Sequence, residues 1–146
     1  MTVDVQEKPI VLLAEDSDDD AYFFQRAFRL AELTCELLRA SNGKIAVELL
    51  EKSRSTGATP FLLFLDLKMP VMSGFDVLQW LRNSPLSPIP AVIVLSGSND
   101  QDDRSRALNL GATDYLVKPI TPDVLREHVL RVAKTCDGLA ATGAPA

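Results

Sequence analysis

Five consecutive apolar residues, 61–65 (FLLFL), follow a proline at position 60 and run directly into the carboxylate of Asp66. An uninterrupted apolar run of this length indicates a β-strand that is buried on both faces, as in parallel sheets that carry helices on either side. Asp66 is then expected at the carboxyl end of the strand, where open parallel sheets bind their ligands. Because an unpaired buried charge is costly, we expect Asp66 to be solvated, paired or bound to a metal.

The same pattern of a short apolar run and a following helical stretch recurs along the chain. Strands are expected at residues 10–14, 34–39, 61–65, 91–95 and 113–117, with 34–39 at a sheet edge because its alternation is weak. The first helix is expected over 21–33, started by a capping arrangement of Ser17 with Asp20. Further helices are expected from 43 to a polar loop beginning at 53, from a cap at Ser73 to 82, from a cap at Ser98 or Asn99 to 110, and from a cap at Thr121 to 134. Five such units predict an α/β fold, the flavodoxin-like (βα)5 doubly wound parallel sheet with strand order 2-1-3-4-5.

Composition and length narrow the class of protein. The 146 residues suit one domain, expected at residues 8–135, followed by a flexible tail rich in small residues at 136–146 and no further domain. A net charge of −5 argues against nucleic-acid binding. No apolar run approaches the roughly 20 residues of a membrane span, and the polar N-terminus does not resemble a secretory signal. Cys35 and Cys136 lack metal or redox spacing, so we expect two reduced thiols in a cytoplasmic protein.

Charged and hydroxyl side chains follow four of the predicted strands, and they are Glu15, Asp16, Asp66, Ser96 and Lys118. In the expected strand order these strand ends are neighbours, so three carboxylates would repel one another unless a cation neutralised them. Carboxylate oxygens suit Mg²⁺, which would keep Asp66 ionised and nucleophilic. Lys118 adds a positive charge and Ser96 a hydroxyl group. This combination favours the capture of a phosphoryl group by Asp66.

Four motifs carry these residues, and together they resemble the receiver domains of two-component response regulators. The motifs are the pair Glu15-Asp16, the segment 66–74 (DLKMPVMSG), the segment 95–98 (LSGS) and the segment 115–119 (YLVKP). The resemblance covers about residues 9–134 and is to the single-domain type with a chemotaxis-regulator-like fold. It implies that Asp66 accepts a phosphoryl group from a histidine kinase. It further implies that Asp16 and Asp66 bind Mg²⁺, helped by the main-chain carbonyl of Lys68 and by Glu15 through water.

The resemblance also assigns the remaining residues of the site. Ser96 and Lys118 would bind the phosphoryl group, and Tyr115 would change its rotamer together with Ser96. A downstream protein, a phosphotransfer partner or a second copy of the chain would bind the face formed by the fourth helix, the fifth strand and the fifth helix. The acidic pair, the aspartates that follow it and the Ser-x-Ser after the fourth strand resemble regulators of hybrid or phytochrome-type sensor kinases.

Other functions are open on the same residues. A receiver-like scaffold could bind partners without phosphate, and an aspartyl-phosphate phosphatase could use the same nucleophile. Such phosphatases place a second carboxylate two residues after the nucleophile, where this chain has Lys68, so no enzymatic turnover beyond the chemistry of Asp66 is expected. A flavin carrier would need small donors after the first strand in place of acids. The acids 18–20 are expected to favour a helix N-terminus, and His128 to be packed or solvated.

Overall fold

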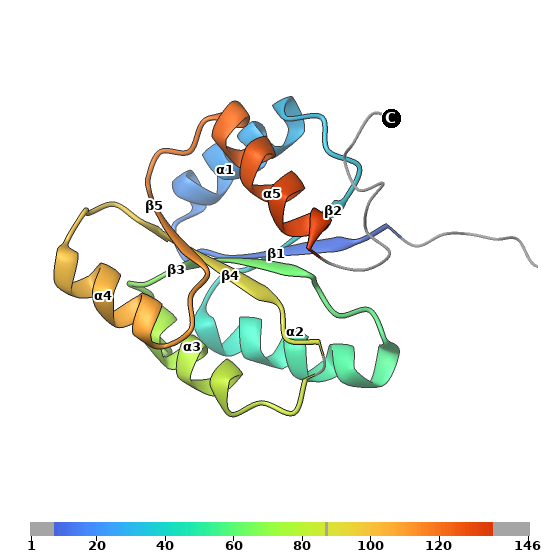
Figure 1. Ribbon diagram of the computed structural model, residues 1–146, viewed down its shortest axis with the longest axis vertical. Helices are drawn as coiled ribbons and strands as arrows, with labels where there is room; N and C mark the ends of the chain where they lie inside the picture. The colour runs from blue at the N-terminus through green and yellow to red at the C-terminus, as the bar shows by residue number, and fades with distance from the viewer. Residues whose placement is uncertain (1–7, 87, 136–146) are drawn as a thin grey trace, which may run out of the picture.

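The computed structural model describes residues 8–86 and 88–135, and it confirms the predicted fold class. Five parallel strands form one sheet in the order β2-β1-β3-β4-β5 (Figure 1). The strands are β1 (Ile10–Ala14), β2 (Glu36–Ala40), β3 (Leu62–Asp66), β4 (Ala91–Ser96) and β5 (Asp114–Val117). The helices are α1 (Asp18–Leu30), α2 (Gly43–Thr56), α3 (Gly74–Arg82), α4 (Gln101–Asn109) and α5 (Pro122–Lys134).

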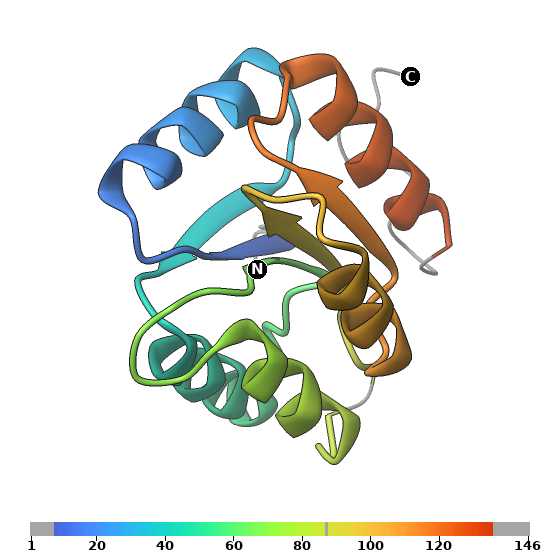
Figure 2. The ribbon, with the colours of Figure 1, turned by 90° about the vertical axis from the view of Figure 1, so that its left-hand side faces the viewer.

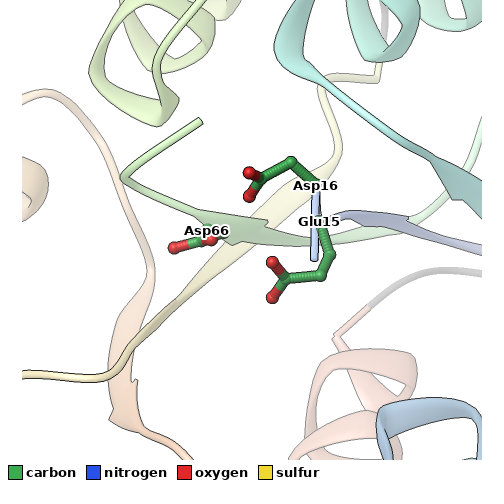
Figure 3. A group of neighbouring side chains, drawn as sticks. All are labelled: Glu15, Asp16 and Asp66. Carbon is green, nitrogen blue, oxygen red and sulfur yellow. The ribbon is translucent and has the colours of Figure 1, made fainter. Parts of the chain in front are cut away.

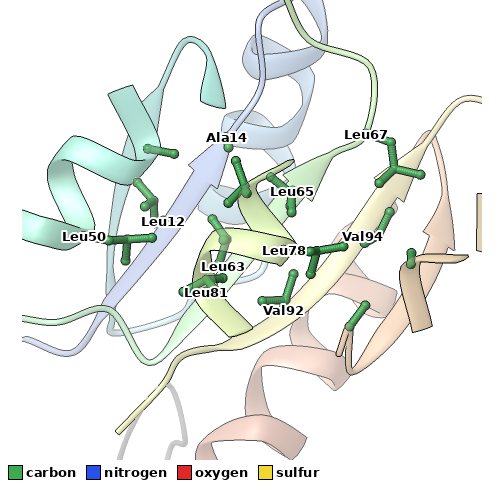
Figure 4. Packing of buried hydrophobic residues seen from close by; sticks show 14 of the residues in the cluster. Leu12, Ala14, Leu50, Leu63, Leu65, Leu67, Leu78, Leu81, Val92 and Val94 are labelled. Atoms are coloured by element: carbon green, nitrogen blue, oxygen red, sulfur yellow. The ribbon is translucent and has the colours of Figure 1, made fainter. Parts of the chain in front are cut away.

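Helices cover both faces of the sheet, with α1 and α5 on one face and α2, α3 and α4 on the other (Figure 2). The side chains of β3 alternate between the two layers of the core. Leu63 and Leu65 pack toward α2 and α3 (Figure 4), whereas Leu62 and Phe64 pack toward α1 and α5. All five residues of β3 are buried, as the unbroken apolar run predicts, and the edge position predicted for the second strand is confirmed.

Local hydrogen bonds decide where three of the helices begin or end; they confirm one predicted cap and correct the bounds of two helices. Helix α1 starts at Asp18, after the cap predicted at Ser17, whose side chain accepts a hydrogen bond from the backbone N–H of Asp20. Helix α2 continues past the predicted loop start at 53 and stops at Gly57, whose φ of 77° is left-handed. Helix α4 is capped by Asp100, not by Ser98 or Asn99.

Gly74 allows the start of α3 to lie directly against the end of β3. A Cβ atom at this position would overlap the main-chain oxygen of Asp66, and backbone atoms there cannot move aside without disturbing the strand. We therefore expect Gly74→Ala to lower the free energy of unfolding by about 1–3 kcal/mol, measured by urea denaturation. Gly97→Ala is the control, since a Cβ atom at Gly97 meets nothing within 4 Å. Equal stability of the two variants would contradict this account.

Other sequence-based expectations concern cysteines and membranes. Cys35 is a buried free thiol, and burial raises the pKa of this thiol to about 11, which makes it unreactive. The predicted tail at 136–146, with Cys136, lies outside the described residues. Among the residues that the structure describes, no helix is both long enough and apolar enough to cross a membrane.

Candidate functional site

Three carboxylates meet at the carboxyl edge of the sheet, where the sequence predicts the site. Glu15 and Asp16 follow β1 directly, and Asp66 is the last residue of β3. One oxygen atom from each lies within 4.8 Å of the others, and the three groups gather beside the strand ends (Figure 3). Glu15 and Asp66 are buried, with exposed fractions of 1% and 7%, whereas Asp16 is exposed. The cluster is therefore closed on the protein side and open to solvent at Asp16.

The ammonium group of Lys118 enters this cluster from the end of β5. Its Nζ lies 2.6 Å from Glu15 Oε1, 2.8 Å from Asp20 Oδ2 and 3.5 Å from Asp66 Oδ2. The backbone N–H of Lys118 donates to the carbonyl of Ser96 at 2.7 Å, and the peptide bond to Pro119 is cis. The structure thus places Lys118 beside Asp66, between two further carboxylates.

Burial and charge shift the proton affinities of this group. Burial raises the pKa of Glu15 from 4.5 to about 7; the hydrogen bond from Lys118 opposes this rise and the charge of Asp66 adds to it. Burial by itself would lower the pKa of Lys118, but hydrogen bonds to Asp20 and Glu15 and the charge of Asp66 raise it above its ordinary value. Lys118 is therefore positively charged at neutral pH.

The main chain around Asp66 is tightly arranged. Asp66 Oδ1 accepts a hydrogen bond from the backbone N–H of Lys68 at 3.3 Å. The side chain of Lys68 is exposed and extends from the loop between β3 and α3. The predicted role of the Lys68 carbonyl as a metal ligand stays a prediction.

Ser96 and Tyr115 are joined through a single residue, Ser98. Ser96 ends β4, is buried, and its Oγ accepts a hydrogen bond from the backbone N–H of Ser98 at 3.1 Å. The Tyr115 hydroxyl donates to the carbonyl of Ser98 at 2.8 Å. The Tyr115 ring is buried, and the Arg104 guanidinium lies 5.6 Å from its centroid. Both predicted switch residues therefore contact the same short stretch of backbone.

Asp20 and Arg39 are two residues near the site that the sequence-based reasoning did not select. Asp20 was expected only to favour a helix N-terminus, but its carboxylate pairs with Lys118. Arg39, in β2, donates from Nε and Nη2 to the carbonyl of Glu15 and from Nη1 to Asp18. Neither contact has a local sequence signal, because both depend on which elements become neighbours in space.

His128 lies on α5, apart from these groups. Its side chain is buried, with Nδ1 2.8 Å from the carbonyl of Val124 and Nε2 3.3 Å from the Asp114 carboxylate. Asp114 also pairs with Arg131. His128 thus packs between α5 and the start of β5, in line with the packed role expected from the sequence.

Comparison with known proteins identifies the family. A model of the response regulator receiver domain matches residues 11–130. The chain belongs to the response regulator receiver domain family. Among solved structures, the bacteriophytochrome response regulator AtBRR is 30% identical, with a TM-score of 0.72 over 84% of this chain and 91% of that one. The Vibrio cholerae chemotaxis protein CheY4 is 26% identical, with a TM-score of 0.71 over 86% of this receiver chain and 98% of that protein.

Curated relatives include proteins of different lengths. The probable methanogenesis regulatory protein FilR2 of Methanothrix harundinacea is 32% identical over 129 residues, which cover 87% of this chain and 83% of that protein. The transcriptional regulatory protein PrrA of Mycobacterium leprae is 37% identical over 124 residues, covering 85% of this chain and 48% of PrrA. The receiver chain also spans 25% of a probable cyclic di-GMP phosphodiesterase of Vibrio cholerae, at 31% identity over 119 residues and 82% of this chain.

Receiver domains as a family are signalling modules that take phosphoryl groups from histidine kinases and typically bind Mg²⁺ at an acidic pocket. This chain has an acidic group, formed by Glu15, Asp16 and Asp66, whose oxygen atoms lie close enough together to hold a metal ion. Membership of the family is consistent with phosphorelay signalling.

Proposed function

We propose that residues 8–135 form a receiver domain that accepts a phosphoryl group from a histidine kinase on Asp66 and signals through the resulting change in shape. The observation that carries this proposal is the convergence of Asp66 with two acids and the Lys118 ammonium at one edge of the sheet. The ammonium group of Lys118, 3.5 Å from Asp66, can stabilise the negative charge of a group bound to that buried carboxylate. The site is open to solvent at Asp16, so such a group can enter from there.

The donor set suits Mg²⁺. Three carboxylates offer hard oxygen ligands within 4.8 Å of one another, and exposed Asp16 leaves room for the waters that Mg²⁺ retains. We assign Asp16, Asp66 and the Lys68 carbonyl as direct ligands and Glu15 as a ligand through water. When bound, Mg²⁺ would neutralise charge on the phosphoryl oxygens and hold Asp66 ionised.

The chain's own groups would act on the phosphoryl group as follows. An oxygen of Asp66 attacks phosphorus, and the bond from phosphorus to the donor's leaving atom breaks. Lys118 donates an N–H to a phosphoryl oxygen and offsets its charge. Ser96 would turn its hydroxyl group away from the Ser98 N–H, from which Oγ now accepts a hydrogen bond, and donate its hydroxyl hydrogen to a second phosphoryl oxygen.

Ser98 suggests how phosphorylation would reach the surface. Turning the Ser96 hydroxyl toward a phosphoryl oxygen would weaken its bond with the Ser98 N–H, and the carbonyl of Ser98 is the acceptor that holds Tyr115. Release of Tyr115 would change the face formed by α4, β5 and α5. A downstream protein, a phosphotransfer partner or a second copy of the chain would bind that face. Such a two-position side chain can act as a switch only if a partner binds one position better.

The kinase is proposed to be a histidine kinase or hybrid sensor kinase of the phytochrome type. Support comes from the likeness to the bacteriophytochrome response regulator AtBRR, at 30% identity over 84% of this chain. We further propose a cytoplasmic protein that binds no nucleic acid and catalyses no reaction beyond phosphorylation and dephosphorylation of Asp66.

Treatment with acetyl phosphate and Mg²⁺ is expected to add one phosphoryl group to the protein, detected by intact-mass spectrometry. Asp66→Asn should abolish the adduct, because an amide is not a nucleophile at phosphorus. Asp123→Asn, at an exposed acid in the first turn of α5, is the matched control and should be phosphorylated normally. An adduct that survives Asp66→Asn would refute the assignment, and no adduct at all would favour a phosphate-independent scaffold.

A further inference from the structure

We propose that Asp20 is a positioning residue for Lys118, which it holds back from Asp66 so that the Asp66 carboxylate remains free to attack phosphorus. This inference rests on the proposed function, because it assigns a role within the same phosphorylation site. Asp20 lies in the first turn of α1 and follows none of the strands that carry the other site residues.

The contacts of Lys118 divide into two short ones and one long one. Its Nζ lies 2.6 Å from Glu15 Oε1 and 2.8 Å from Asp20 Oδ2, both within the range of strong charge-assisted hydrogen bonds. The distance to Asp66 Oδ2 is 3.5 Å, beyond the usual range for such a bond. An ammonium group has three N–H donors, so the bonds to Glu15 and Asp20 use two of them and leave one for a third acceptor.

This division has a chemical consequence. If Nζ moved into close contact with Asp66 Oδ2, that oxygen would be paired with a cation and less nucleophilic. Glu15 alone cannot prevent the movement, because it can hold Nζ from one side only. Asp20 supplies the second anchor, which leaves the remaining N–H available for a phosphoryl oxygen on Asp66.

The local structure keeps Asp20 available for this contact. The backbone N–H of Asp20 donates to Ser17 Oγ, and the backbone N–H of Ser17 donates to Glu15 Oε2 rather than to the Asp20 carboxylate. In a capping box the third helical residue would return its side chain to the cap residue, as Asp76 does at Ser73. Because Glu15 occupies the Ser17 N–H, the carboxylate of Asp20 reaches across to Lys118.

The test measures the rate constant for phosphorylation at saturating acetyl phosphate and Mg²⁺ in two Asp20 variants. Asp20→Ala removes the anchor and should slow phosphorylation about tenfold, the size expected when a supporting residue is lost. Asp20→Asn keeps an acceptor oxygen, so its phosphorylation rate should fall less than that of Asp20→Ala. Asp19→Ala is the matched control, since Asp19 is exposed on the same turn and its side chain has no partner among the described residues. Its rate should equal that of the unmodified protein.

A double-mutant cycle with Lys118→Ala separates positioning from a general effect of charge. In the Lys118→Ala background, Asp20→Ala and Asp20→Asn should no longer lower the rate of phosphorylation, because Asp20 is proposed to act only through Lys118. The partly exposed ion pair between Asp20 and Lys118 adds little to stability, so the variants should fold. If Asp20→Ala does not fold, the double-mutant cycle is measured with Asp20→Asn.

The outcomes distinguish this inference from the function on which it rests. An Asp20→Ala rate equal to or above that of Asp19→Ala, or a loss that persists without Lys118, would overturn the positioning role alone. Failure of the unmodified protein to form any adduct would overturn the proposed function and this inference together. A tenfold loss that requires Lys118 would support both.

Discussion

Replacing Lys118 with alanine is expected to slow phosphorylation of Asp66 by roughly a hundred- to a thousand-fold, the range measured when a single charge-stabilising donor is removed from an active site. Lys118 is the only cation whose contact with Asp66 is found among residues 8–86 and 88–135, at 3.5 Å. Its loss leaves the charge on the phosphoryl group uncompensated from the protein side. The rate constant for adduct formation from acetyl phosphate, followed by mass spectrometry, gives the measurement.

Two further variants show whether charge or position matters. Lys134→Ala removes an exposed lysine of the last turn of α5 and should leave the rate unchanged. Lys118→Arg keeps the positive charge but replaces a compact ammonium with a planar fork, which cannot reproduce the contacts with Glu15, Asp20 and Asp66. We expect it to remain at least tenfold slower than the unmodified protein. A Lys118→Ala rate within threefold of the unmodified rate would exclude Lys118 from the chemistry.

Without metal, the protein is expected to lose stability as the pH rises from about 4.5 to about 7, because the pKa of Glu15 is raised over that interval. The folded state binds the Glu15 proton more tightly than the unfolded state does. This contribution to stability is therefore complete below the unfolded pKa of 4.5 and is lost as the pH passes the folded pKa of about 7. The loss amounts to about 3 kcal/mol at 1.36 kcal/mol per pKa unit.

Urea denaturation in EDTA across this pH interval tests the expectation. Glu15→Gln should flatten the pH dependence, since glutamine does not titrate and can still accept a hydrogen bond from Lys118. Glu127→Gln, at an exposed position of α5, should keep the full dependence and serves as the control. Identical slopes for both variants would show that another group is responsible.

The fold could be predicted because its strands carry strong local signals. The run that ends in Asp66 has no polar residue, and a strand buried on both faces can be accommodated in few ways. The end of α2 and the start of α4 were predicted less accurately, because the left-handed Gly57 and the single cap Asp100 decide them.

Three of the predicted site residues could be recognised from their position in the sequence. Glu15, Asp66 and Ser96 each stand at the end of an apolar run, so the pattern that predicts the strand also predicts where these side chains lie. Asp20 and Arg39 reach the site from α1 and β2, through side chains whose targets are 98 and 24 residues away in sequence. No periodicity encodes such contacts, and they become visible only when the elements are packed together.

The pairing register of the sheet has a practical consequence for work on the protein. Asp66 is paired with Leu95, and Ser96 with Val117, the residue before Lys118. Because side chains alternate along a strand, a slip of one residue would turn the Asp66 carboxylate away from its neighbours. Circular dichroism would record the same content of strand in a slipped and in a native sheet. The fraction of molecules that accept phosphate therefore measures the fraction of a refolded sample in which the strands are paired in the native register.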